Sequence, residues 1–227
     1  MVSPSQPSEG VGVLHLFWTA TPLTDRDAVL AAVEKAEAAG DQVVMVAMLG
    51  HKADIAVMIL GDDMWRLRQF QTELTTADLL LVDSYVSITE VSEYAAGVPD
   101  EMKQARLYPK FPIPDKQSWC FYPMSKRRTT NENWFTLPFD DRRDLMMEHG
   151  TSGRKFAGRL VQLITASTGL DEYEWGVTLF ATRPDDLKDV VYTMRYDEAS
   201  ARYAEFGPFY TGMVASPDEV LTSVGVD

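Results

Sequence analysis

Hydrophobic residues follow both helical and strand spacing along the first ninety residues. Apolar residues recur at helical spacing over residues 25–39, where Thr24 is a candidate N-cap and Gly40 a stop signal. A second helix should begin after Asp62 or Asp63. The apolar runs that predict strands span residues 11–20, 42–49, 53–60 and 79–89. The predicted order is β-α-β-β-α-β, the split ferredoxin-like unit.

The same order of elements is predicted a second time, after an irregular stretch over residues 94–116 that holds four prolines. The strands of this second copy are predicted over residues 119–124, 159–166, 174–181 and 206–214, and its helices over 140–148 and 184–194. Gly150 should end the first helix, and Pro208 should interrupt the last strand. Element order therefore predicts an α+β fold of two tandem ferredoxin-like repeats whose sheets close on each other.

These elements divide the chain into four parts. Residues 1–10 are polar and are expected to form a disordered tail. An N-terminal ferredoxin-like repeat is expected over residues 11–95, a linker over 96–116, and a C-terminal, ligand-binding repeat over 117–227.

Composition restricts the classes of partner and compartment. The net charge of −13 argues against nucleic acid and anionic membranes as partners. Cys120 is the only cysteine, so the chain can form no internal disulfide and no metal site made of cysteines, which fits a reducing compartment. The first residues lack a signal-peptide pattern, and no apolar run reaches 18 residues. The expected location is the cytoplasm.

A basic cluster follows a tyrosine near the middle of the chain. Tyr122 is followed by Lys126, Arg127 and Arg128, which stand out against the acidic background. The cluster is either a solvated turn or a site that captures a small anion. Carboxylates of a ligand could pair with Lys126 and Arg127 beside the oxidisable phenol of Tyr122.

Three histidines are candidates for metal ligation. His15 lies among apolar strand residues, which favours a core histidine with satisfied hydrogen bonds, and His51 lies in a turn, which favours a solvated side chain. His149 lies near the end of a predicted helix. There it is either an iron ligand or an imidazolium that interacts favourably with the helix C-terminus.

Other candidate residues have a structural alternative. Gln162 is polar within an apolar strand and either faces solvent or hydrogen-bonds a ligand. Trp134 is an oxidisable ring or an ordinary buried indole, and Arg195 and Arg202 are surface charges or anion clamps. No glycine-rich phosphate loop, HExxH sequence or nucleophile elbow is present.

Taken together, several segments resemble the chlorite dismutase-like superfamily, and within it the coproheme decarboxylases of the Firmicutes type. The segments that carry this resemblance are YPMSKRR from Tyr122, NWFTLP, RRDLMMEHG, SGRKFAG, DEYEWGVTLFA and MRYDEASARYAEFGPFYTG. The match is dense over residues 119–212 and looser over 11–95.

The resemblance implies a dimeric α+β barrel within one chain, assembled into a homopentamer. It implies iron coproporphyrin III as substrate and hydrogen peroxide as oxidant, with two propionates decarboxylated to vinyl groups to give haem b. A coproporphyrin ferrochelatase would be the partner that acts upstream.

The resemblance also implies roles for single residues. His149 would be the proximal ligand of the haem iron, Tyr122 the radical-forming tyrosine, and Lys126 the partner of the second reactive propionate. The remaining positions implied by the resemblance are Gln162 as the neutral distal residue, Arg195 as a propionate contact, and Trp134 and Trp175 as possible redox-active tryptophans. Arg127 is a further candidate propionate contact because it directly follows Lys126.

The alternatives are a chlorite dismutase, a general haem peroxidase, and a haem carrier or sensor without turnover. Chlorite dismutases carry a distal arginine where Gln162 stands, and a neutral amide cannot hold an oxyanion in the same way. Actinobacterial decarboxylases have a distal histidine there. A simple peroxidase would not need Lys126 beside Tyr122.

Overall fold

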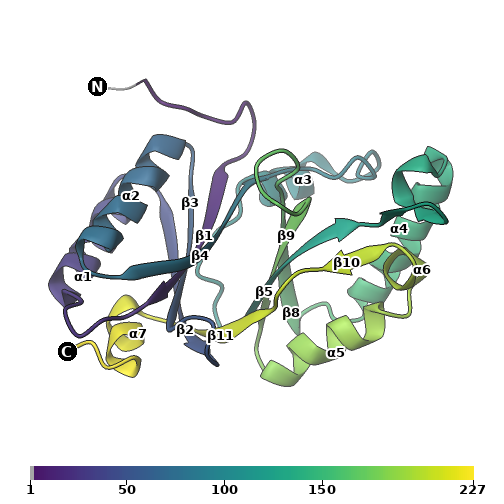
Figure 1. Cartoon of the computed structure of the whole chain (residues 1–227). Helices are drawn as coiled ribbons and strands as arrows, with labels where there is room; N and C mark the ends of the chain where they lie inside the picture. Colours follow the sequence, from purple (N-terminus) through teal and green to yellow (C-terminus); the bar gives the residue numbers. More distant parts are fainter. Residues whose placement is uncertain (1–2) are drawn as a thin grey trace.

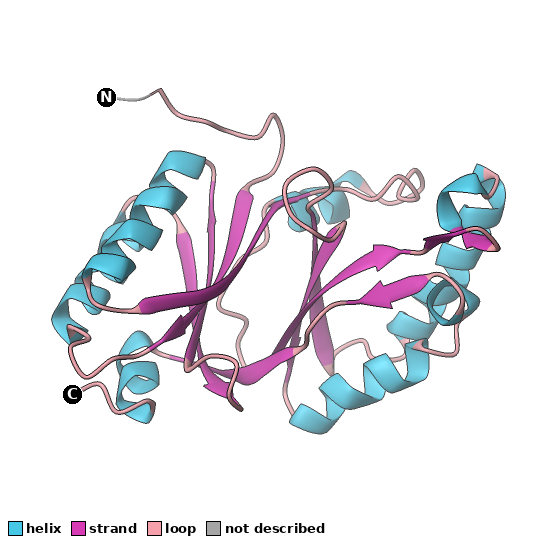
Figure 2. Ribbon diagram, in the orientation of Figure 1, coloured by secondary structure: helices cyan, strands magenta, loops and turns pink. Residues whose placement is uncertain are grey.

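A closed β-barrel forms the centre of the protein in the computed structural model, which describes residues 3–227. The strands pair in the order β10-β5-β11-β2-β3-β1-β4-β8-β9, and β9 pairs again with β5, which closes the ring. Figure 2 shows helices outside the strands of both halves. The predicted α+β fold with two sheets that close on each other is therefore confirmed.

The N-terminal half has the predicted order of elements. These are β1 Gly12–Thr19, α1 Arg26–Ala38, β2 Gln42–Leu49, β3 Ile55–Gly61, α2 Met64–Thr76 and β4 Leu80–Thr89. Asp63 caps α2, but the N-cap of α1 is Asp25 and not Thr24. The Asp25 carboxylate accepts from the backbone N–H of Ala28 at 3.0 Å, whereas the Thr24 hydroxyl donates to the carbonyl of Asp78.

The second half repeats the order with additional short elements. The elements after residue 95 are α3 Asp100–Leu107, β5 Ser118–Lys126, β6 Arg128–Thr129, β7 Glu132–Asn133, the 3₁₀ helix η1 Trp134–Thr136, α4 Phe139–Arg154, β8 Leu160–Ala166, β9 Trp175–Ala181, α5 Pro184–Met194, α6 Glu198–Ala201, β10 Ala204–Phe206, β11 Tyr210–Ala215 and α7 Pro217–Ser223. The predicted interruption at Pro208 separates β10 from β11.

Two predictions about local structure were wrong. Helix α4 continues through Gly150, which has no left-handed φ, and the glycine with positive φ after this helix is Gly158. The predicted linker contains helix α3.

The predicted tail makes several contacts with the rest of the fold. The Ser5 N–H donates to the Asp63 carboxylate at 3.0 Å, and Gly10 is buried against Thr89. The first two residues of that predicted tail lie outside the described residues.

Apolar side chains pack both inside and outside the barrel. Inside, β1, β3, β5 and β9 contribute Phe17, Met58, Phe121 and Phe180. Outside, helices α1, α2 and α7 cover the N-terminal half, and α4, α5 and α6 lie against the C-terminal half (Figure 1). No helix in the described part of the chain is long and apolar enough to cross a membrane.

The two halves are joined where β11 pairs with β2 and where β4 pairs with β8, and the first of these contacts needs a glycine. A Cβ on Gly212 would lie 2.4 Å from the backbone oxygen of Ala47. We expect Gly212→Ala to lower the free energy of unfolding by about 1–3 kcal/mol, since the strands must separate to admit the methyl group. Gly97→Ala is the control because its Cβ meets nothing within 4 Å. Equal urea midpoints for the two variants would contradict this packing argument.

Candidate functional site

The outer face of β5, β9 and β8 brings several predicted site residues together. Residues two apart on a strand share a face, so Tyr122, Met124 and Lys126 project from the same side of β5. Tyr122 is in register with Val177, which is in register with Ile164. In the next row, Gln162 is aligned with Leu179 and Cys120. Tyr122 and Gln162 therefore lie on one face, about 12 Å apart across two strand spacings and two residues along the strands.

The Tyr122 side chain is buried beneath aromatic rings. Its ring stacks on Phe209 at 4.4 Å between centroids and meets the edge of Phe206 at 5.6 Å. Burial raises the pKa of the phenol well above its usual range, with a smaller contribution from Cys120. Its hydroxyl makes no hydrogen bond to any residue that the structure describes. Tyr122 is therefore a neutral phenol without a protein base beside it.

Lys126 is a buried cation at the end of β5. Its Nζ donates to the carbonyl oxygen of Ala199 at 2.6 Å and lies 4.4 Å from the centroid of the Trp134 ring. Burial lowers the pKa of Lys126 to about 8, against the opposing effect of the Glu174 carboxylate. A ligand carboxylate that pairs with Lys126 would replace the weaker carbonyl acceptor.

His149 lies on α4 and is oriented by residues of the α5–α6 region. Its Nδ1 lies 3.1 Å from the Asp197 carboxylate, whose second oxygen accepts from the Ser152 hydroxyl at 2.8 Å. Ser200 Oγ is 3.4 Å from the same Nδ1. Burial and the charge of Lys126 lower the pKa of His149, while Asp197 raises it. A neutral imidazole whose Nδ1 faces a carboxylate leaves Nε2 available to a metal.

The two predicted arginines have different surroundings. Arg127 pairs with Glu132 at 2.6 Å and lies 3.5 Å from Glu205, so it already has carboxylate partners. The Arg195 guanidinium lies 3.8 Å from the centroid of the Tyr192 ring and donates to the hydroxyl of Tyr196. Arg195 has no carboxylate partner among residues 3–227, which leaves it available to an anion.

The predicted tryptophans lie at different ends of this face. Trp134 is buried and packs edge-on against Tyr203 at 5.4 Å. Trp175 is in register with Met124 and donates from Nε1 to Glu90 at 3.2 Å. Trp175 thus projects from the same face as Tyr122. Trp134 lies near that face because its ring contacts the ammonium of Lys126.

The other histidines do not contribute to this face. His51 is exposed in a turn, as predicted. His15 is inside the barrel, where its Nε2 is 2.8 Å from the Thr178 hydroxyl and its ring stacks on Phe121. The prediction of a satisfied histidine holds for only one nitrogen, because Nδ1 has no partner among the residues described. Burial lowers the pKa of His15 to about 3.

A cavity of about 410 Å³ lies beneath α5, next to the site. Cys120 and Phe209 line it together with apolar residues of α5, and Arg195 and Lys188 contribute cations. Phe209 lines this space and also stacks on the Tyr122 ring. The cavity therefore adjoins the predicted site on the side of Arg195.

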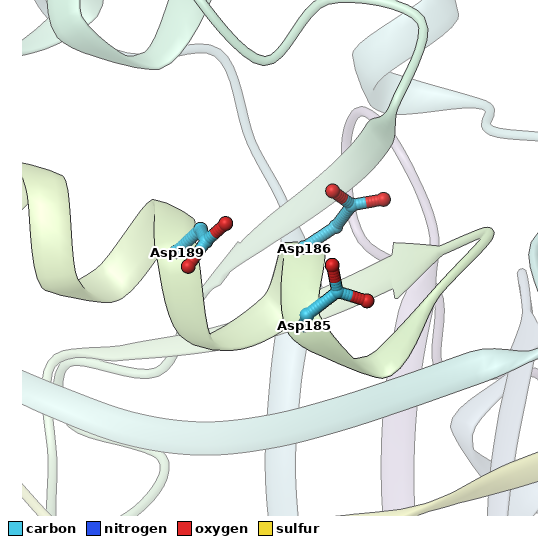
Figure 3. A group of neighbouring side chains, drawn as sticks. All are labelled: Asp185, Asp186 and Asp189. Atoms are coloured by element: carbon cyan, nitrogen blue, oxygen red, sulfur yellow. The ribbon is translucent and has the colours of Figure 1, made fainter.

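Three aspartates gather on α5, as Figure 3 shows, but they have cationic partners. Arg159 donates from Nε to Asp186 at 2.8 Å and lies 3.6 Å from Asp189. Arg183 lies 3.6 Å from Asp185. The group is neutralised by arginines and gives no argument for a metal ion.

Comparison with known proteins agrees with this architecture. Residues 25–215 match the family model described as chlorite dismutase. The chain belongs to the chlorite dismutase family. A heme-binding protein from Thermus thermophilus is 33% identical, with a TM-score of 0.85 over 99% of this chain and 100% of that one. A mutant chlorite dismutase from Candidatus Nitrospira defluvii, 18% identical over 96% and 97% of the chains, shares the fold with a TM-score of 0.76.

Two relatives found by sequence have names that indicate a ligand or an activity. The coproheme decarboxylase of Staphylococcus carnosus is 47% identical over 76% of this chain and 72% of the relative. A candidate heme-binding protein of Natronomonas pharaonis is 39% identical over 96% of this chain. The chain spans 41% of the length of that second relative.

Sequence reasoning missed the residues that orient His149. Asp197 and Ser152 are 48 and 3 positions away along the chain, and neither belongs to a recognisable spacing with the histidine. The one available signal was Asp197 itself, which directly precedes the short helix α6 as its N-cap residue.

The Asp197 carboxylate should measurably raise the affinity of His149 for a proton. Asp197→Asn replaces the charged carboxylate by a neutral amide of similar shape. The pKa of His149 should therefore fall further below its ordinary value. NMR titration of the His149 ring in the ligand-free protein measures this change. The control is Asp62→Asn, a remote carboxylate on the other half of the barrel. An unchanged or higher pKa in Asp197→Asn would contradict the contact.

Proposed function

We propose that this protein is a coproheme decarboxylase. It would convert two propionates of iron coproporphyrin III to vinyl groups, with hydrogen peroxide as oxidant, and release haem b. The observation that carries this proposal is the common face of β5, which presents a buried, oxidisable phenol, Tyr122, and a cation, Lys126, four residues along the same strand. The 47% identity to a coproheme decarboxylase supports it.

The residues of the site fit an iron porphyrin with acidic side chains. His149 offers a neutral imidazole nitrogen for the iron, and Ile164, which is exposed on the same face as Tyr122, offers an apolar side chain to the macrocycle. Gln162 would lie on the distal side as a neutral hydrogen-bonding group. When bound, the iron porphyrin supplies the oxidising equivalents that peroxide delivers.

Each decarboxylation balances with one molecule of peroxide. A propionate, one H₂O₂ and one proton give a vinyl group, one CO₂ and two water molecules. Tyr122 would lose an electron and its hydroxyl proton, and the resulting phenoxyl radical would take a hydrogen atom from the β-carbon of the propionate. Loss of a second electron and of CO₂ then leaves the double bond.

Lys126 and Arg195 would hold the propionates. Lys126 would exchange the Ala199 carbonyl for a carboxylate, and Arg195 would engage its unpaired guanidinium. Fixing the position of the reacting carbon beside the phenol can lower the barrier by several kcal/mol. Arg127 would contribute only if it released Glu132.

The proposal extends to the oligomeric state, the location in the cell and the partner enzyme. It includes a homopentamer, a cytoplasmic location, and a coproporphyrin ferrochelatase that supplies the substrate. Trp134 and Trp175 would be redox-active neighbours of the site. Light scattering of the purified protein tests the pentamer.

The experiment that tests the reaction adds peroxide to the complex with iron coproporphyrin III and follows the porphyrin masses. Stepwise loss of two carboxyl groups is expected. Bleaching without these products would indicate a carrier or sensor, and sustained oxygen release from chlorite, measured with an oxygen electrode, would indicate a chlorite dismutase instead.

Tyr122→Phe should abolish formation of haem b and leave the affinity for iron coproporphyrin III within a few fold. The reason is that phenylalanine keeps the stacking on Phe209 but has no O–H to lose. Mass spectrometry of the porphyrin after peroxide addition measures the product. Tyr108→Phe, on an exposed tyrosine after α3, is the control and should react normally. A normal yield from Tyr122→Phe would remove Tyr122 from the reaction.

Lys126→Ala should stop the reaction after the first decarboxylation, because Lys126 is proposed to pair with the second propionate only. The expected main product is a porphyrin with three propionates, detected by mass spectrometry. Lys103→Ala, which removes a lysine of α3 remote from the site, should proceed to haem b. Passage of Lys126→Ala to haem b at the wild-type rate would exclude this role.

A further inference from the structure

Tyr210, a second tyrosine close to Tyr122, has a carboxylate beside its hydroxyl, which Tyr122 lacks. Tyr210 begins β11, is 6% exposed, and stacks on Phe17 inside the barrel with 3.9 Å between ring centroids. Its hydroxyl donates a short hydrogen bond to the carboxylate of Asp83 on β4. Asp83 is itself exposed to solvent, so a proton that it receives can leave the protein.

Another tyrosine of the same apolar cluster provides a natural comparison. Tyr85 is buried and lies 5.3 Å from Phe121, but its hydroxyl meets the neutral hydroxyl of Ser167. Ser167 in turn donates to the carbonyl oxygen of Tyr173 at 2.8 Å, and the Tyr85 hydroxyl lies 3.3 Å from the same carbonyl, so both partners of Tyr85 are neutral. A serine hydroxyl is a very weak base, whereas an ionised carboxylate readily accepts a proton.

The group that accepts the hydroxyl proton decides which phenol is oxidised more easily. Removal of an electron makes a phenol strongly acidic, and a buried ring cannot hold the resulting positive charge without a large desolvation cost. The ammonium of Lys52, 5.3 Å from the centroid of the Tyr210 ring, adds to this cost. Oxidation of Tyr210 is therefore favourable only if the proton leaves with the electron, and Asp83 is positioned to receive it.

Two short connections join Tyr210 to Tyr122. Tyr122 stacks on Phe209, which directly precedes Tyr210 in the chain. Tyr210 is also in register with Phe121, the residue before Tyr122, and these two rings lie 6.4 Å apart between centroids. An electron can pass from Tyr210 to Tyr122 through either ring without crossing a large gap.

We propose that Tyr210 and Asp83 form a second redox site, which donates an electron to the Tyr122 radical when no propionate is in place to react. This inference rests on the proposed function. Tyr210 loses one electron, and its hydroxyl proton moves to Asp83. Tyr122 gains that electron and one proton from the medium, which reforms its O–H bond. Asp83 then releases its proton to the medium, so charge and atoms balance.

The pair can be tested without any porphyrin. The ligand-free protein is oxidised by flash photolysis with a ruthenium tris-bipyridine sensitiser and persulfate as the final electron acceptor, and its tyrosyl radicals are recorded by high-field EPR and ENDOR. The wild type should show a radical coupled to one strongly held exchangeable proton. Tyr210→Phe should lose this component, while Tyr85→Phe, the matched control, should keep it.

Variants of Asp83 separate the proton acceptor from a merely structural contact. Asp83→Asn should remove the exchangeable coupling or the radical itself, and Asp83→Glu should restore it, with near-ultraviolet circular dichroism reporting on folding. An unchanged radical in Tyr210→Phe or in Asp83→Asn would overturn the inference.

The same variants in the peroxide reaction show whether the pair serves Tyr122. In the complex with iron coproporphyrin III whose propionates are esterified, Tyr210→Phe should prolong the lifetime of the Tyr122 radical. An equal lifetime in the wild type would overturn the link between the two tyrosines. Absence of haem b from the wild type with unmodified substrate would instead contradict the proposed function and leave the photochemical result standing.

Discussion

The structure depends on one strand, β5, that is hydrogen-bonded along both edges. One edge pairs with β9 over residues 118–124, and the other pairs with β11 and then β10. These pairings close the barrel and fix the alternation of its side chains. Trp119 and Phe121 therefore point into the core, while Tyr122 and Lys126 point outward. A shift of register by one residue would exchange the two sets, so the stability of the core and the position of the site are specified together.

The site is completed from outside the barrel by buried charges that balance one another. Burial lowers the pKa of Lys126 below its ordinary value. The positive charge of Lys126 in turn lowers the pKa of His149. Asp197 opposes this effect and at the same time fixes the orientation of the ring. The three groups come from β5, α4 and the turn before α6, so the imidazole stays neutral and oriented only when these elements pack. Neutrality matters because a protonated nitrogen has no lone pair for a metal.

Much of this arrangement could be predicted from the sequence because it depends on local patterns. Apolar periodicity placed β2 and α5 at their observed bounds, and Pro208 predicted the break between β10 and β11. Gly150 was misleading, since a glycine typically ends a helix through a left-handed backbone, and Gly150 keeps the right-handed backbone of α4. Contacts between distant segments, such as Asp197 with His149 or Asp83 with Tyr210, have no local pattern and required the folded structure.

The different surroundings of the two tyrosines have a consequence for selectivity under the proposed function. Tyr122 is buried without a proton acceptor among the described residues, so its oxidation is unfavourable in the protein alone. A propionate bound beside it would bring a carboxylate, the same type of base that Tyr210 finds in Asp83. The substrate would then supply a base that favours oxidation of Tyr122. A Tyr122 radical that formed without a propionate beside it would have no group to attack, and Tyr210 would return it to the phenol.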